Sequence, residues 1–169
     1  MKVVYPYDTT PFVKISIEEV VLTLAEAIAL VFVIMFLFLQ NFRATLIAAV
    51  SIPTSIVAAF AIIKYMGFTL NSLTLLALTL SVGIVIDDAV VVHENIFRHM
   101  EEFGRSAMEA ARSATSEIAS AVVATTVSLL VIFIPVAFMQ GRIGRFFNSF
   151  GFTVGFAILM SMFVSFTMT

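Results

Sequence analysis

Residues 73–92 read LTLLALTLSVGIVIDDAVVV, an apolar run that is interrupted by two adjacent carboxylates, Asp87 and Asp88. An α-helix needs about 20 apolar residues to cross the hydrocarbon core of a bilayer. Asn71 or Ser72, just before the run, is expected to cap such a helix. Because each charged residue near the bilayer centre costs roughly 2.5–3.5 kcal/mol to insert, the two aspartates are candidate functional residues of a transmembrane helix.

Similar apolar runs occur on both sides of this stretch. The chain of 169 residues is 61% hydrophobic and 12% charged, whereas soluble domains are about half apolar and a quarter charged. We therefore expect an all-α membrane protein with the bilayer as its solvent, and a soluble helical bundle is the alternative that extraction without detergent would reveal. The expected bundle has about five transmembrane helices, at 20–39, 44–66, 73–92, 118–139 and 150–169.

The polar segment 94–117 separates the third run from the fourth. The third helix is expected to continue to Phe103 and to end at Gly104. Ser106 and Glu109 have the spacing of a capping box, which predicts a new helix start. Apolar and charged residues then alternate at helical spacing, which is typical of a short helix at a membrane interface.

The sequence lacks the residues that several classes of function require. The net charge is −2 without a basic run, so no nucleic-acid partner is expected. The chain has no Cys, and its two histidines, His93 and His99, have no third ligand type grouped around them, so no metal is expected. No nucleophile or phosphate-loop motif is present, which argues against an enzyme and gives no reason to expect a cofactor.

The carboxylate pair has two interpretations. Two ionised carboxylates in a poorly screened medium repel each other, so Asp87 or Asp88 is expected to bind a proton more tightly than an exposed carboxyl does. Such a group suits proton coupling. Alternatively, the pair marks the end of the span at the membrane surface, although Val90–Val92 continue the apolar run. Gly83 and Ser81 precede the pair and would admit a neighbouring helix.

Other polar residues in or near the spans are candidate accessories. Glu26 lies in the first run and is either an interfacial residue or a functional one. His93 and Glu94 follow the third run, where they form either part of a proton path or ordinary polar surface. Lys64 is expected to mark the end of the second span.

Orientation in the membrane does not follow from charge. If the spans alternate in direction, four basic residues lie on one side of the membrane and five on the other. This difference is too small for the positive-inside rule to give the orientation. One side has Arg43, Arg98, Arg105 and Arg112, and the other has Lys2, Lys14, Lys64, Arg142 and Arg145.

Three segments carry a resemblance to a known family: GIVIDDAVVVHEN at 83–95, YPYDTTPFV at 5–13 and FLQNFRATL at 38–46. The chain resembles the hydrophobe/amphiphile efflux family of the RND superfamily, the AcrB-type multidrug exporters of Gram-negative bacteria. The resemblance is collinear and covers essentially the whole chain. His93 departs from it, because many of these pumps have an apolar residue there.

The resemblance implies that the chain is a fragment with helices two to six of a twelve-helix inner-membrane subunit. Residues 1–19 would end the periplasmic porter region, 20–169 would be the membrane bundle, and 94–117 would be cytoplasmic. It further implies a homotrimer with a periplasmic adaptor and an outer-membrane channel. Besides the lipid bilayer, the fragment would contact the remainder of its own polypeptide, which supplies a Lys partner for the carboxylate pair.

The resemblance also implies a function, proton influx that drives the export of amphiphilic, drug-like substrates. Asp87 and Asp88 match the family's proton-carrying pair, with Gly83, Glu26, His93 and Glu94 as possible accessories. Related heavy-metal exporters usually lack the second Asp. The alternative is a non-transporting sterol-sensing, Patched-like or regulatory membrane module, but those relatives lack the Val-x-Glu-Asn that ends at Asn95.

Overall fold

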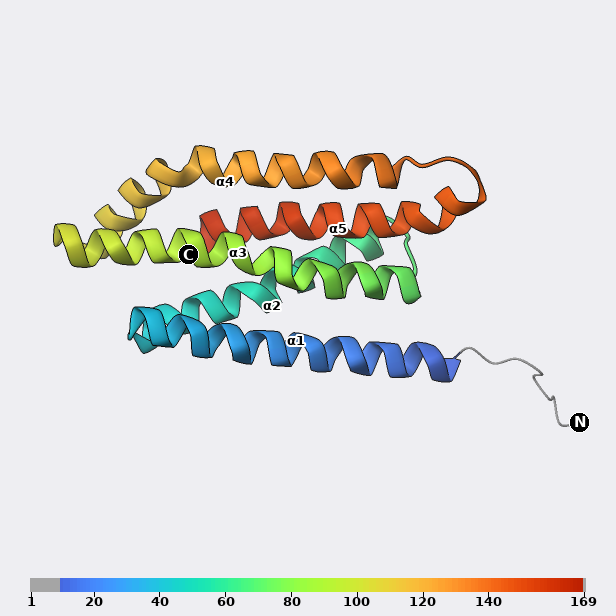
Figure 1. Cartoon of the computed structure of the whole chain (residues 1–169), viewed down its shortest axis with the longest axis horizontal. Coiled ribbons are helices and arrows are strands. Elements are labelled where there is room, and N and C mark those ends of the chain that lie inside the picture. Colours follow the sequence, from blue (N-terminus) through green and yellow to red (C-terminus); the bar gives the residue numbers. More distant parts are fainter. Residues whose placement is uncertain (1–9, 169) are drawn as a thin grey trace, which may run out of the picture.

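The computed structural model describes residues 10–168, without the side chains of Leu24, Phe38, Leu39, Arg43, Ala44, Ile47 and Ala48. In this range the chain forms five α-helices and no strand (Figure 1). They are α1 (Thr10–Leu39), α2 (Phe42–Tyr65), α3 (Ser72–Phe103), α4 (Ala107–Ala137) and α5 (Gly141–Met168). The prediction of an all-α bundle of five helices is confirmed.

Helix α3 is the centre of the bundle. It packs against each of the other four helices, whereas α1 contacts only α2 and α3 among the described residues. Helix α5 lies beside α3 and α4 and also contacts α2 (Figure 1). The helix that carries the two aspartates is therefore the one through which the other helices are connected.

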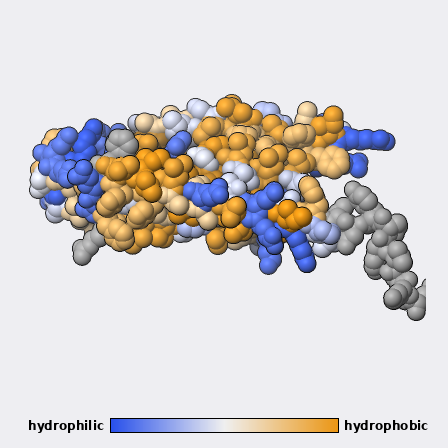
Figure 2. All heavy atoms as spheres, turned by 60° about the horizontal axis from the view of Figure 1, so that its bottom comes forward, coloured by the Kyte–Doolittle hydropathy of each residue, from blue (hydrophilic) through white to orange (hydrophobic). Residues whose placement is uncertain are grey.

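The surface is that of a protein solvated by lipid. Four helices, α1, α3, α4 and α5, are long and apolar enough to cross a membrane, and α2 has a shorter apolar segment, Ala49–Tyr65. Large apolar side chains point outward from several helices, such as Leu37, Val57 and Ile132, each more than 60% exposed. Figure 2 shows apolar residues over much of one face, with hydrophilic ones gathered mainly towards its ends. In hydrocarbon this exposure carries no hydrophobic cost.

Helices α1 and α5 extend well before the predicted starts of their spans. Helix α1 is already formed at Thr10, the first described residue, instead of at residue 20. Helix α5 begins at Gly141 instead of residue 150. The apolar run predicts the part of a helix in hydrocarbon, but the helix itself continues into polar sequence. Residues 1–9 of the segment 1–19, which the resemblance assigns to the end of the porter region, lie outside the described residues.

The ends of α3 and α4 agree with the predicted capping. The Asn71 side chain accepts hydrogen bonds from the backbone N–H groups of Leu73 and Thr74, at 2.9 and 3.0 Å. Gly104 has the left-handed conformation, φ +60°, that ends α3, and the Ser106 N–H donates to Glu109 at 3.3 Å. The short polar helix expected within 94–117 is not a separate element, because its residues are shared between the end of α3 and the first turns of α4.

Helices α4 and α5 approach closely at Gly151. A Cβ atom at this position would lie 2.5 Å from the backbone nitrogen of Ala137, closer than van der Waals contact allows. The Asn148 side chain, one turn earlier, donates to the Ala137 carbonyl at 2.6 Å. Glycine at 151 thus lets the start of α5 pack directly on the end of α4.

We predict that Gly151→Ala destabilises the bundle by about 1–3 kcal/mol, because the added methyl group overpacks a backbone contact. The measurement is the thermal unfolding of the detergent-solubilised, full-length protein. Gly155→Ala is the matched control, since its Cβ would meet only the Leu130 side chain, at an ordinary 3.7 Å. Equal melting temperatures for the two variants would contradict the prediction.

Candidate functional site

The carboxylate pair lies near the middle of α3, not at its end. Asp88 is half-buried and Asp87 is exposed. Both line a cavity of about 210 Å³ between α3 and α4, where Thr125 is the only other polar residue. The remaining walls are apolar: Ile84, Val91, Ala121, Val122 and Leu129. The two carboxyl groups therefore share one small, largely apolar space in which a proton has few alternative acceptors.

Helix α5 approaches the pair through Ser161. Its hydroxyl is buried and donates a hydrogen bond to the Val85 carbonyl of α3 at 2.8 Å. The same side chain lies beside the Asp88 carboxyl. A small polar residue thus holds α5 against α3 at the height of the aspartates.

One stripe of α3 is exposed in the described part of the chain. It consists of residues spaced three or four apart, which share a helix face. The stripe, called here the open stripe, contains Leu76, Leu80, Gly83, Asp87, Val91 and Glu94, all of them exposed. A Cβ added at Gly83 would meet nothing within 4 Å. The expected neighbouring helix at Gly83 is therefore absent from the described range, while Ser81, on another face, is buried.

The structure does not bring the accessory candidates together. Glu94 shares the open stripe with Asp87, but it lines a separate groove of about 490 Å³ between α1 and α3. His93 is 6% exposed, and neither ring nitrogen has a hydrogen-bond partner. At about 100° per residue it points about 140° away from Asp88. Glu26 is exposed on α1 and does not line the cavity at the pair.

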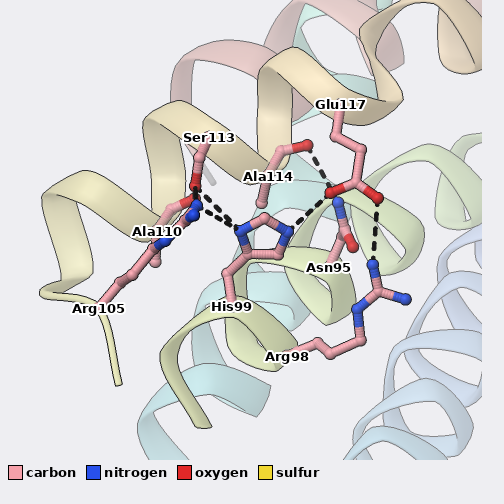
Figure 3. A network of polar contacts seen from close by, with 8 residues as sticks. All are labelled: Asn95, Arg98, His99, Arg105, Ala110, Ser113, Ala114 and Glu117. Atoms are coloured by element: carbon pink, nitrogen blue, oxygen red, sulfur yellow. Dashed lines mark hydrogen bonds and ion pairs between the residues drawn. The ribbon is translucent and has the colours of Figure 1, made fainter. Parts of the chain in front are cut away.

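A polar network that the sequence analysis did not identify connects the ends of α3 and α4 (Figure 3). Its centre is His99, which is 5% exposed. The ring nitrogen Nδ1 lies 2.9 Å from the Ser113 hydroxyl, and Nε2 lies 2.7 Å from the Glu117 carboxylate. Arg98 forms an ion pair with the same carboxylate at 3.3 Å. The network crosses between the two helices just before they are joined by the turn at Gly104.

Contacts of two further residues, Arg105 and Asn95, complete the network. The Arg105 Nη1 lies 3.1 Å from the His99 Nδ1 and also donates to the Ser113 hydroxyl. The Asn95 side chain donates to the Ala114 carbonyl at 3.0 Å. The turn itself was a usable signal, because a tight helical hairpin brings the end of one helix alongside the start of the next.

No group of three or more His, Asp or Glu side chains within residues 10–168 is arranged to hold a metal ion. His99 and Glu117 lie together, but their further neighbours are a hydroxyl and two guanidinium groups.

Comparisons with known proteins identify the family. The chain is 46% identical to the multidrug resistance protein MdtF of Escherichia coli, and 45% identical to the multidrug export protein AcrF of the same organism. It is 41% identical to the toluene efflux pump membrane transporter TtgB of Pseudomonas putida. Each match covers 100% of this chain but 16% of the relative, so the chain spans about a sixth of their length. The model of the AcrB/AcrD/AcrF family matches residues 1–169, and the chain belongs to that family of the RND superfamily.

Proposed function

We propose that this chain is part of the membrane domain of a proton-driven multidrug efflux transporter, and that Asp87 and Asp88 bind the coupling proton. The names of its relatives, multidrug resistance, multidrug export and efflux pump proteins, support the transport class. The observation that carries the proton assignment is the position of the pair. It lies midway along the central helix, beside a small cavity with apolar walls.

Electrostatics gives the pair its chemistry. Two adjacent carboxylates that are both ionised repel each other, and few polar neighbours are present to stabilise two negative charges. A proton bound by either carboxyl removes that repulsion and lowers the cost of keeping the pair in hydrocarbon. Binding and release of the proton therefore change whether the middle of α3 is more stable in apolar or in polar surroundings.

Helix α3 can pass such a change to the rest of the bundle. It contacts all four other helices, and Ser161 joins it to α5 at the height of the pair. A shift of α3 towards or away from α5 would thus accompany the change in charge. This is population shift between two packings, driven by their different affinity for a proton.

The open stripe is where the remainder of the pump would pack. Gly83 allows close approach of another helix, and Asp87 lies one turn further along the same face. The family resemblance implies that this helix belongs to the second membrane half and supplies a Lys. A cation opposite Asp87 would stabilise the ionised pair, so that proton binding and the contact with Lys would exclude each other.

The wider assembly is proposed on the same basis. The relatives are described as multidrug and solvent exporters, and four helices of this chain can cross a membrane. We propose the inner membrane of a Gram-negative bacterium, a homotrimer with an adaptor and outer-membrane channel, and amphiphilic substrates. A regulatory module of the same superfamily is the competing function, and proton flux into liposomes that contain the full-length protein separates the two.

We predict that Asp87→Asn or Asp88→Asn in the full-length protein reduces drug export at least tenfold. The amide keeps the shape and hydrogen bonding of the side chain but cannot exchange a proton. Export is measured as dye efflux from an efflux-deficient strain at matched protein levels. Stability should be unchanged or higher, because an amide avoids the cost of desolvating an anion.

The matched control is Glu101→Gln, the same change from acid to amide near the end of the same helix. It should export like the wild type. If both Asp variants also export normally, the pair does not carry the proton.

We also predict the sidedness of the bundle, which the family resemblance implies. Arg112→Cys should react with a membrane-impermeant thiol reagent only from the cytoplasm, and Arg142→Cys only from the periplasm. Both arginines are exposed, Arg112 near the start of α4 and Arg142 near the start of α5. These two helix starts lie at opposite ends of the bundle (Figure 1). The reaction is followed in intact cells and in inverted vesicles of a full-length protein without other reactive cysteines. The reverse pattern would overturn the implied topology.

A further inference from the structure

The network at the α3–α4 turn contains an ionisable group that the proposed mechanism does not use. We propose that His99 is a proton-binding site in its own right, separate from Asp87 and Asp88, at which a proton on Nδ1 displaces Arg105 and leaves Ser113 as the partner of that nitrogen. The proposal rests on the geometry of Figure 3 and does not depend on the assignment of the aspartate pair.

His99 lies between a cation and an anion. A guanidinium group has only donors, and the Arg105 Nη1 lies 3.1 Å from the His99 Nδ1. Nδ1 can accept from it when the ring hydrogen is on Nε2, which lies 2.7 Å from the Glu117 carboxylate and can donate to it. The same Arg105 nitrogen donates to the Ser113 hydroxyl. This arrangement is the proposed state without a proton on Nδ1.

A second proton is incompatible with this arrangement. It would place an N–H of a charged imidazolium against the guanidinium of Arg105, so that two donors and two positive charges face each other. Ser113 can take over, because its oxygen lies 2.9 Å from Nδ1 and can accept from it. The Ser113 hydroxyl then keeps its own donor for the Ala110 carbonyl, at 3.3 Å.

The two sides of His99 respond differently to the proton. Glu117 keeps its hydrogen bond from Nε2 and gains an ion pair, while it also keeps Arg98 at 3.3 Å. Arg105 is exposed and packs over the Phe103 ring at 5.3 Å. Its donation to the Ser113 hydroxyl would compete with the donation from the protonated Nδ1, so the guanidinium can move into solvent. Protonation therefore releases the turn while His99 remains bound to α4 through Glu117.

Among the side chains that the structure describes, no other charged group forms a hydrogen bond or ion pair with His99. The partners of His99 come from α3, α4 and their turn. Arg112 and Glu109 line the same surface groove as Arg105 but do not contact the ring in any described bond. Helix α5 has no ionisable residue after Arg145. The charges that face His99 are thus those of Glu117, Arg105 and, through Glu117, Arg98.

The test is the chemical reactivity of Arg105 in the full-length pump. Phenylglyoxal modifies accessible guanidinium groups, and peptide mass spectrometry quantifies each arginine separately. Arg112 is the internal control, because it is exposed on the same helical hairpin. The measured quantity is the ratio of modification at Arg105 to modification at Arg112. In this ratio the pH dependence of the reagent itself cancels. Histidine changes charge between about pH 5 and 8, which sets the range of the titration.

We expect the ratio to rise at least threefold from about pH 8 to about pH 5 in the wild type. In His99→Gln it should be independent of pH. In Glu117→Gln the rise should remain but move to lower pH, because the anion that favours the imidazolium is gone. A constant ratio in the wild type would overturn the proposal without any variant. A rise that persists in His99→Gln would assign the effect to another group and would also overturn it.

Discussion

A helix in hydrocarbon has no water to satisfy its polar groups, so every hydrogen-bonding group that it carries must find a partner within the protein. The buried hydroxyls of this chain show the constraint directly. Ser55, Ser81 and Thr153 each donate to the backbone carbonyl four residues earlier, at 2.6 to 2.9 Å. Because these hydroxyls are satisfied inside their own helices, they need no polar partner on a neighbouring helix.

Close packing through small residues also holds α3 at the centre of the bundle. Helix α5 contacts α2, α3 and α4, and fully buried alanines, Ala77 on α3 and Ala157 on α5, belong to these contacts. Lipid chains are as apolar as the side chains, so close van der Waals contact has to hold such helices together. Gly151 extends this contact to the backbone of α4. The result is a bundle in which α3 is surrounded, except along its open stripe.

Local signals allowed part of this structure to be predicted from the sequence. The apolar runs predicted the five helices, and Asn71 and Gly104 marked both ends of α3, because caps and left-handed residues act within a few positions. The extension of α1 back to Thr10 could not be predicted, since polar residues also continue a helix beyond the bilayer. The contact of His99 with Glu117 was missed for another reason. It joins residues 18 positions apart and exists only once the turn has brought α3 and α4 together.

The two proposed proton sites on α3 respond to a proton in opposite ways. In the proposed mechanism, protonation of the pair at Asp87 and Asp88 would remove charge from an apolar cavity. Protonation of His99 adds charge and removes a contact that ties the turn to the helices. The sites lie roughly 16 Å apart along one helix, too far for a direct hydrogen bond. Their connection is the helix itself, a rigid element whose position both protons influence. Acidification at the turn would therefore leave α3 freer to move, whereas proton loading at its centre would decide where it moves.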